Sequence, residues 1–146
     1  MPSMDAMAPD NSRQSPVSEG KVLIVDDEEY VRGVLLDMLD VLGFKSLAAA
    51  DGDRGLAAFE NARGSDNPED TIIACIVDLT MPGMPGMELL ARIREIDAEV
   101  PILLVSGYSR HEVRQQQAKN PNIGFLQKPF TLDQFRDVFS THVEMP

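Results

Sequence analysis

The sequence predicts an α/β protein built as a three-layer sandwich, with an open parallel sheet of five strands between two layers of helices. Two observations predict this fold class. From residue 21 onward, short apolar runs alternate five times with segments of helical periodicity. The apolar runs contain few polar residues, which is typical of strands covered on both faces. Because the connections are short, the strands should be parallel and joined by right-handed crossovers, with helices on both sides.

The first half of the chain contains two strand–helix units and a loop. The apolar run at 22–25 is the first predicted strand, and a helix follows whose apolar residues are spaced along one face. Those residues are Tyr30, Val31, Val34, Leu35, Met38, Leu39 and Leu42, and Gly43 ends the helix. A weaker second strand covers 44–49, and Asp51 caps a helix that runs to about residue 63. Residues 64–70 then form a polar loop.

The second half contains three further units. The third predicted strand is 72–77, and the MPGMPG segment at 81–86 forms a tight loop, because proline lacks an amide donor and glycine permits unusual dihedrals. The other predicted elements are a helix at about 87–96, a strand at 102–105, a polar helix at about 110–119, a strand at 123–126 and a helix at about 132–142. We therefore expect one folded domain at 21–143. Residues 1–20 lack an apolar period and are expected to be a disordered leader or linker.

Composition limits the function classes. A chain of 146 residues has room for one domain with a full core. The formal net charge of −11 opposes nucleic-acid binding, which depends on Lys and Arg against phosphate. No apolar run approaches the roughly 20 residues that cross a bilayer, and the N-terminus lacks a signal pattern. We expect a soluble cytoplasmic protein without nucleic-acid or membrane contact, in which the single cysteine, Cys75, is a buried structural thiol.

Three aspartates lie at the ends of two apolar runs. Asp26 and Asp27 follow the run at 22–25, and Asp78 follows the run at 72–77. If these runs are parallel neighbours, all three carboxylates emerge at one edge of the sheet. So much negative charge in one place is unfavourable unless a cation neutralises it. Mg²⁺ is the expected cation, because it prefers oxygen ligands and keeps part of its water shell.

A hydroxyl and an ammonium follow two further strands. Ser106 directly follows the fourth predicted strand, and Lys128 comes just after the fifth. A lysine among aspartates could form a plain ion pair, but a phosphoryl group bound there would use every part of the site. Mg²⁺ and Lys128 would neutralise its oxygens and Ser106 would donate a hydrogen bond. Asp78 would be the nucleophile, forming an aspartyl phosphate.

Over residues 21–143 the chain resembles the receiver domain of two-component response regulators. The matching motifs are LIVDDEEYVR, VDLTMPGMPGMELL, PILLVSGYS and GFLQKPF, which occur in the order and at the spacing of that family. Each motif alone is weak, but four together, each at a strand end, are specific. The resemblance implies a flavodoxin-like (βα)5 fold with strand order 2-1-3-4-5. It also implies a phosphoacceptor in a phosphorelay, which modifies itself and has no turnover on a free substrate.

The resemblance implies a role for each site residue. Asp78 would accept a phosphoryl group from a phosphohistidine on a histidine kinase or a histidine phosphotransfer protein. Asp27, Asp78 and the backbone carbonyl of Thr80 would bind Mg²⁺ directly, and Asp26 would bind it through water. Ser106 and Lys128 would contact the phosphoryl oxygens. The Lys128-Pro129 peptide bond is expected to be cis, a form that is common only before proline.

The resemblance further implies a mechanical switch. Ser106 would move toward the phosphoryl group, and the aromatic side chain three residues before the lysine, Phe125, would fill the vacated space. Many family members have Tyr there, so a signal that depends on a tyrosine hydroxyl is in doubt. The face made by the fourth helix, fifth strand and fifth helix would then bind a downstream protein. Tyr108, at the mouth of the pocket, is either a screen against hydrolytic water or a simple surface aromatic.

Two alternatives stand beside this interpretation. A flavin-binding domain, or a phosphatase with an aspartyl nucleophile, could use the same fold. Flavin binding favours a Gly- and hydroxyl-rich loop after the first strand, where this chain has Asp-Asp-Glu-Glu, and Leu79-Thr80 offers no second acid for a phosphatase. The sequence also leaves open a stand-alone regulator or the C-terminal receiver of a hybrid histidine kinase, although the SGYS and GFLQKPF motifs favour the latter.

Overall fold

The computed structural model contains one five-stranded sheet, and it describes residues 19–107, 114, 117–118 and 122–146. The strands are β2 (Lys21–Val25), β3 (Lys45–Ala49), β4 (Ile72–Asp78), β5 (Ile102–Ser106) and β6 (Ile123–Gln127). All neighbouring pairs are parallel, and the spatial order is β3-β2-β4-β5-β6. Counted along the chain this is the order 2-1-3-4-5, so the predicted fold class and strand order are confirmed.

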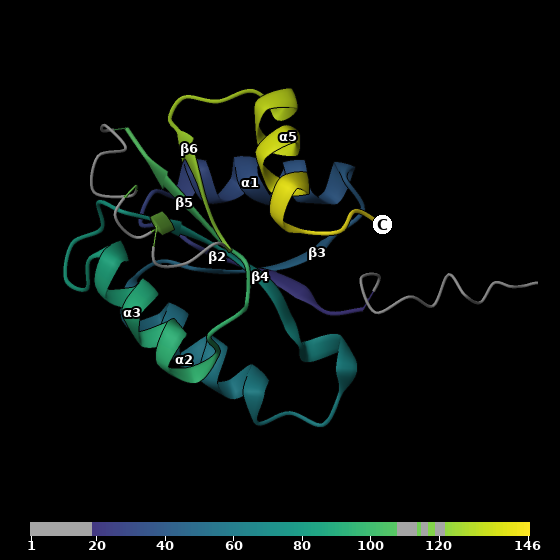
Figure 1. Ribbon diagram of the computed structural model, residues 1–146, viewed down its shortest axis with the longest axis vertical. Helices are drawn as coiled ribbons and strands as arrows, with labels where there is room; N and C mark the ends of the chain where they lie inside the picture. The colour runs from purple at the N-terminus through teal and green to yellow at the C-terminus, as the bar shows by residue number, and fades with distance from the viewer. Residues whose placement is uncertain (1–18, 108–113, 115–116, 119–121) are drawn as a thin grey trace, which may run out of the picture.

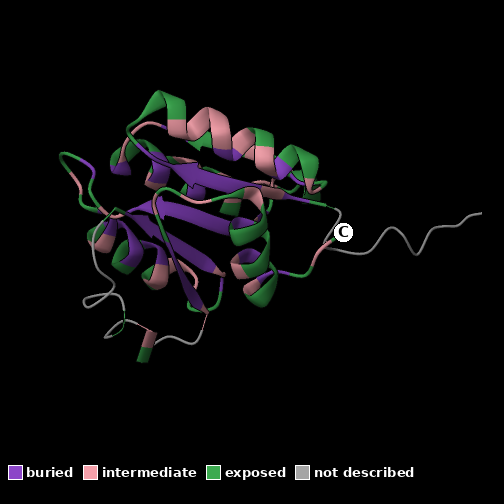
Figure 2. Cartoon of the chain, turned by 90° about the horizontal axis from the view of Figure 1, so that it is seen from above, coloured by how far each residue is buried: buried purple, intermediate pink, exposed green. Residues whose placement is uncertain are grey.

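Helices cover both faces of the sheet (Figure 1). Helices α1 (Glu29–Val41) and α5 (Leu132–His142) lie on one side, and α2 (Gly52–Arg63) and α3 (Gly86–Ile96) lie on the other. A short 3-10 helix, Pro68–Asp70, occupies the predicted polar loop. Residues of β2, β4, β5 and β6 are almost entirely buried, whereas the edge strand β3 and the outer sides of the helices are mostly exposed (Figure 2). This burial explains the apolar runs of those four strands, because side chains on both of their faces pack against helices. It also explains why the β3 segment has the weaker strand pattern.

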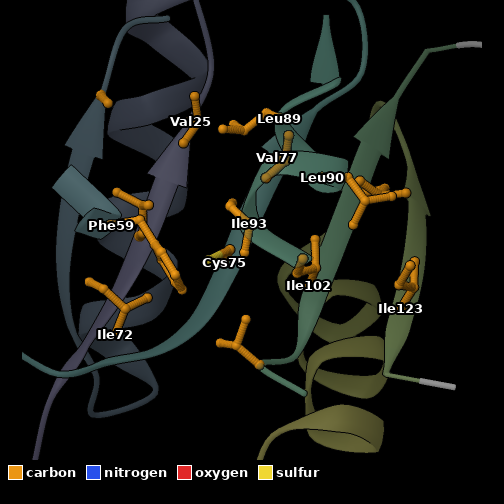
Figure 3. Packing of buried hydrophobic residues seen from close by; sticks show 14 of the residues in the cluster. Val25, Phe59, Ile72, Cys75, Val77, Leu89, Leu90, Ile93, Ile102 and Ile123 are labelled. Atoms are coloured by element: carbon orange, nitrogen blue, oxygen red, sulfur yellow. The ribbon is translucent and has the colours of Figure 1, made fainter. Parts of the chain in front are cut away.

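Two apolar cores fill the spaces between the layers. One packs the α2 and α3 side chains Phe59, Leu89 and Ile93 against the sheet, and it includes Cys75 (Figure 3). The other packs α1 and α5 against the opposite face. Burial raises the pKa of the Cys75 thiol to about 12, so the thiol stays protonated and packs as a small apolar group. The position supports a structural role for this cysteine.

Capping side chains mark the starts of α2 and α5. The Asp51 carboxylate accepts a hydrogen bond of 2.8 Å from the Arg54 amide, as expected for the N-cap of α2. Thr131 and Gln134 form a reciprocal capping box at the start of α5. Strands β4, β5 and β6 each run one residue further than predicted, so Asp78 and Ser106 are strand residues.

One predicted side-chain position is wrong. The sequence pattern placed Tyr30 on the buried face of the first helix, but its side chain is 82% exposed. Only Leu35 and Leu39 of α1 are fully buried. Tyr30 precedes Leu35 by five positions, which is about 140° around an α-helix. The stripe of α1 that meets the sheet is narrower than the apolar pattern, so Tyr30 lies on its outer side.

Several predictions fall outside the described residues. They include the leader at 1–18, Tyr108 and nearly all of the helix expected at 110–119. Among the residues that the structure does describe, no helix is long and apolar enough to cross a membrane.

Gly86, at the start of α3, lies so close to the backbone at the end of β4 that a substitution there tests this packing. A Cβ atom there would collide with the Asp78 carbonyl oxygen and come within 2.8 Å of Leu79 Cα. Both neighbours are backbone atoms and cannot move aside cheaply, so Gly86→Ala is expected to lower the free energy of unfolding by about 1–3 kcal/mol. Gly33→Ala is the matched control, because a Cβ there has open space in the interior of α1. It should raise stability by about 0.5–1 kcal/mol, and urea unfolding of both variants measures the contrast.

Candidate functional site

The candidate site lies at the carboxyl edge of the sheet. Asp26 follows β2, Asp78 is the last residue of β4, and Lys128 follows β6. The register aligns the strand ends, since Val25 pairs with Val77 and Asp78 pairs with Val105. Because all strands are parallel, side chains from positions far apart in the sequence meet at this edge.

Three carboxylates, those of Asp26, Asp27 and Asp78, lie close together there and are called the acid group. Asp26, Asp27 and Asp78 each offer an oxygen, and these atoms lie within 4.8 Å of one another. Asp26 is 1% exposed and Asp78 is 2% exposed, while Asp27 faces solvent. A hard divalent cation fits this set, because it takes oxygen ligands and one side of the group is open to water.

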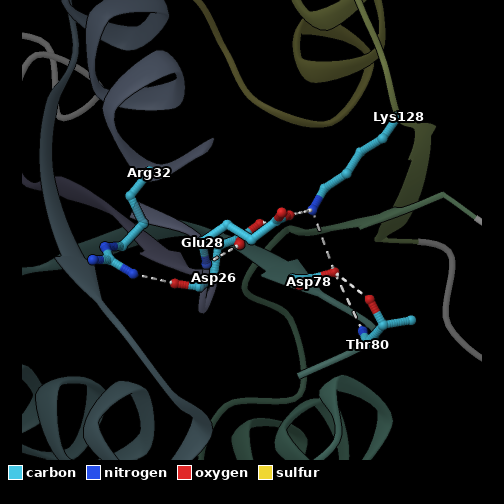
Figure 4. A network of polar contacts seen from close by, with 6 residues as sticks. All are labelled: Asp26, Glu28, Arg32, Asp78, Thr80 and Lys128. Atoms are coloured by element: carbon cyan, nitrogen blue, oxygen red, sulfur yellow. Dashed lines mark hydrogen bonds and ion pairs between the residues drawn. The ribbon is translucent and has the colours of Figure 1, made fainter. Parts of the chain in front are cut away.

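The Lys128 ammonium lies among the carboxylates (Figure 4). Its Nζ atom is 3.1 Å from Asp26 Oδ2, 3.2 Å from Glu28 Oε1 and 3.7 Å from Asp78 Oδ1. The site thus contains four carboxylates, from Asp26, Asp27, Glu28 and Asp78, and one ammonium, from Lys128. The single positive charge of Lys128 does not fully neutralise the four negative charges.

Hydrogen bonds fix the two buried carboxylates. The backbone amide and the hydroxyl of Thr80 both donate to Asp78 Oδ1, each at 3.2 Å. Asp26 Oδ1 accepts from the Glu28 amide at 2.8 Å, and the Asp26 carbonyl accepts from Arg32 Nη1 at 2.8 Å. The bonds hold the acid side chains in place before any ligand binds, which is how a preorganised site is built.

The pKa values of Asp78 and Lys128 reflect both burial and the neighbouring charges. Burial raises the pKa of the Asp78 carboxyl, and the charge of Asp26 raises it further, while Thr80 and Lys128 only partly offset these effects. Burial lowers the pKa of Lys128, but the hydrogen bond and charge of Asp26, together with Asp78, outweigh it and raise the pKa overall. The ammonium therefore stays charged at neutral pH, and Asp78 would gain from a further cation.

Ser106 is the last residue of β5, and Phe125 lies in β6 opposite Leu104. Ser106 is 1% exposed and Phe125 is 7% exposed. The Ser106 carbonyl accepts a hydrogen bond of 2.8 Å from the Lys128 amide, so the serine is joined directly to the lysine. By strand alternation, Ser106 and Phe125 project from the same face of the sheet as Leu104, toward the core that contains α2 and α3.

The structure brings together Asp26, Asp27, Asp78 and Lys128, as the sequence predicts. The Lys128-Pro129 bond is cis, which confirms that prediction. Sequence reasoning missed two contacts, the Glu28 carboxylate on Lys128 and the Arg32 guanidinium on the Asp26 backbone. Glu28 stands beside the paired aspartates, but its partner is 100 residues away, so no local pattern indicates the contact.

A parallel sheet of order 2-1-3-4-5 with aspartates and a lysine at one edge is the architecture of receiver domains in two-component signalling. Residues 22–140 match the family model of the response regulator receiver domain, and the chain belongs to this family. Receiver domains take phosphoryl groups from phosphodonors and hydrolyse the product, and they bind Mg²⁺ at an acidic pocket. The family does not favour the flavin-binding or phosphatase alternative.

Two curated relatives differ in how much of their length this chain matches. The C4-dicarboxylate transport transcriptional regulatory protein DctD of Pseudomonas aeruginosa is 33% identical over 120 residues, which are 82% of this chain and 24% of that protein. Sporulation initiation phosphotransferase F of Bacillus subtilis is 26% identical over 125 residues, covering 86% of this chain and 94% of that protein. The chain thus spans about a quarter of one relative and nearly all of the other.

Solved structures agree with the fold. The receiver domain of the hybrid histidine kinase CckA is 31% identical with a TM-score of 0.67, covering 86% of this chain and 100% of that one. A chain of the Borrelia burgdorferi complex of CheX, CheY, BeF3 and Mg²⁺ is 25% identical with a TM-score of 0.72, covering 85% and 90%.

Proposed function

We propose that Asp78 is the phosphoacceptor of a two-component phosphorelay and that it takes a phosphoryl group from a partner phosphohistidine in a Mg²⁺-dependent reaction. One observation carries the proposal. Asp78 is a buried carboxylate within 4.8 Å of two other carboxylates, and its Oδ1 atom is 3.7 Å from the Lys128 ammonium. Such a group suits a nucleophile that must meet a doubly charged phosphoryl group between two sources of positive charge.

The acid group suits a Mg²⁺ ion, because its donor atoms are oxygens and its charge is negative. Asp27, Asp78 and the Thr80 carbonyl would hold the ion directly, and Asp26 would hold it through water. The raised pKa of Asp78 supports this assignment, because burial and the charge of Asp26 outweigh the effect of Lys128, and a further cation would stabilise the carboxylate. Bound Mg²⁺ would neutralise charge on the phosphoryl oxygens.

In the proposed step, an Asp78 carboxylate oxygen attacks the phosphorus atom of the donor. The new O–P bond forms as the N–P bond to histidine breaks, and the electron pair of that bond returns to the imidazole. Lys128 donates to a phosphoryl oxygen, and Ser106 donates a second hydrogen bond. Hydrolysis by water later restores the free carboxylate, so the domain catalyses only its own modification.

A hollow beside Lys128 supports approach of the phosphodonor from the α1 side. Its volume is about 410 Å³, and it is lined by Tyr30, Val31, Val34, Lys128, Pro129 and Phe130. The exposed ring of Tyr30 makes this surface apolar at its outer end. We propose that the histidine kinase or phosphotransfer protein docks there, with its phosphohistidine directed at Asp78.

Output is proposed to pass through Ser106 and Phe125. Both are buried and project from the same face of the sheet, so a shift of the Ser106 side chain toward a phosphoryl oxygen would leave space that the Phe125 ring can enter. The face of β6 and α5, together with the helix that the sequence predicts at 110–119, would change and bind a downstream protein. The partners are expected to be proteins, since a net charge of −11 opposes nucleic acid.

The wider context is also a proposal. We propose that residues 21–143 are the receiver domain, that 1–20 are a linker, and that the domain works in the cytoplasm. Sequence motifs and likeness to the CckA receiver support an origin in a hybrid histidine kinase. Likeness to sporulation initiation phosphotransferase F over nearly its full length supports a stand-alone regulator instead.

Incubation with acetyl phosphate tests the proposed chemistry. With Mg²⁺ present, intact mass should rise by one phosphoryl group per chain, and a chelator should prevent the gain because the attack needs the cation. An unchanged mass in Mg²⁺, or an equal gain with the chelator present, would contradict the proposed function.

A further inference from the structure

The Glu28 carboxylate reaches across the site to Lys128. Its Oε1 atom accepts a hydrogen bond of 3.2 Å from Lys128 Nζ, although the two residues are 100 positions apart. The Glu28 side chain is 61% exposed, so nothing forces it into this position by burial. Figure 4 shows the Glu28 side chain directed at the Lys128 ammonium.

The contact does not serve the local backbone. Glu28 is the N-cap residue of α1, yet its side chain makes no capping hydrogen bond. Its amide donates to Asp26 Oδ1 at 2.8 Å, and this bond anchors the residue at the mouth of the site. The Glu28 carboxylate therefore does not cap α1 and instead contacts Lys128, which indicates that its role concerns the lysine.

The carboxylates closest to the Lys128 ammonium are consequently those of Asp26 and Glu28, and not that of Asp78. Its Nζ atom is within 3.2 Å of Asp26 and of Glu28, while the distance to Asp78 Oδ1 is 3.7 Å. An ammonium has three N–H donors, and a phosphoryl group on Asp78 needs at least one of them. Asp26 is 2% exposed on its side chain and holds the lysine from inside the site, so Glu28 is the partner that the lysine can release at lower cost.

We propose that Glu28 is a positioning residue for phosphoryl transfer, whose carboxylate holds the Lys128 ammonium back from Asp78 until a phosphoryl group arrives. The proposal rests on the proposed function of Asp78 and adds a control on its rate. Release of Glu28 would accompany movement of Lys128 to the phosphoryl oxygens. Removing the Glu28 charge should therefore speed phosphoryl gain.

Kinetics of three variants test this role. Phosphoryl gain from acetyl phosphate is followed by intact mass at saturating Mg²⁺ for wild type, Glu28→Gln and Glu29→Gln. Glu29 is the matched control, because it is the next residue, carries the same charge and is exposed. We expect Glu28→Gln to be roughly two- to fivefold faster than wild type, the size of a partly exposed ion pair, and Glu29→Gln to stay close to wild type.

Glu28→Asp separates contact from charge. This variant keeps the charge, but its side chain is one methylene shorter and is not expected to keep the contact with Lys128. It should behave like Glu28→Gln if the contact matters. Rates for Glu28→Gln equal to those of Glu29→Gln, or for Glu28→Asp equal to those of wild type, would overturn the proposal. If wild type gains no phosphoryl group at all, the proposed function itself fails, which is a distinct outcome.

A second readout needs neither metal nor phosphodonor. In the metal-free protein, NMR relaxation of the Lys128 ε-methylene group reports how firmly the ammonium is held. The order parameter should fall in Glu28→Gln and in Glu28→Asp and stay unchanged in Glu29→Gln. An order parameter in Glu28→Gln equal to that of wild type would overturn the positioning role.

Discussion

Asp78→Asn is expected to abolish phosphoryl gain while the fold is kept. The asparagine amide has nearly the same shape as the carboxylate but no anionic oxygen to attack phosphorus. The variant should show no added mass after incubation with acetyl phosphate and Mg²⁺. Its thermal unfolding should remain cooperative, because it removes a buried charge whose pKa is raised by burial and by Asp26.

The hydrogen bonds give a reason for attack by Asp78 rather than by its neighbour Asp26. Asp26 has both carboxylate oxygens engaged, one by the Glu28 amide and one by Lys128. The bonds that Asp78 accepts from Thr80 both fall on Oδ1. Asp78 therefore keeps more of its acceptor capacity for a new bond.

Asp53→Asn is the matched control for this experiment. Asp53 is an exposed carboxylate in the first turn of α2 and does not belong to the group of Asp26, Asp27 and Asp78. It should gain the phosphoryl group as wild type does. Phosphoryl gain by Asp78→Asn at the rate of this control would show that another residue is the acceptor.

Lys128→Met is expected to slow phosphoryl gain by about two orders of magnitude. Methionine keeps much of the length of the side chain but removes the only ammonium among the described residues that lies within 4.0 Å of Asp78. The charge that develops on the phosphoryl oxygens then loses one of its two proposed sources of neutralisation. Single-turnover phosphorylation at saturating Mg²⁺, followed by intact mass, measures the change.

Lys45→Met controls for the general loss of a positive charge. Lys45 is exposed at the start of the edge strand β3, and its removal should leave the rate close to that of wild type. A Lys128→Met rate within twofold of wild type would contradict the proposed role of the ammonium.

Much of the site was predictable because parallel strands end at one edge of a sheet. Once the chain is divided into five strand–helix units, Asp26, Asp78 and Lys128 all fall just at or after strand ends, so they should gather. The order of the strands did not follow from periodicity. It came from the resemblance to receiver domains, and the register of β4 against β2 and β5 confirms it.

What sequence reasoning missed depends on distances in three dimensions. Tyr30 fits the apolar pattern of α1, but the pattern does not reveal how wide a stripe the sheet covers. Glu28 and Lys128 both lie past strand ends at the carboxyl edge of the sheet, and their side chains meet there although β4 and β5 separate β2 from β6. Nothing in either segment indicates the pairing. The backbone clash at Gly86 likewise depends on how α3 sits against the end of β4.

A crystal structure with Mg²⁺ and beryllofluoride, a mimic of the phosphoryl group, tests whether this edge of the sheet is the phosphoryl site. We expect the beryllium to be bonded to an Asp78 carboxylate oxygen, with Mg²⁺ about 2.0–2.1 Å from oxygens of Asp27, Asp78 and the Thr80 carbonyl. Lys128 should have left Glu28 to contact a fluorine atom. Beryllofluoride bonded to another residue, or Mg²⁺ bound away from the three aspartates, would contradict the proposed site.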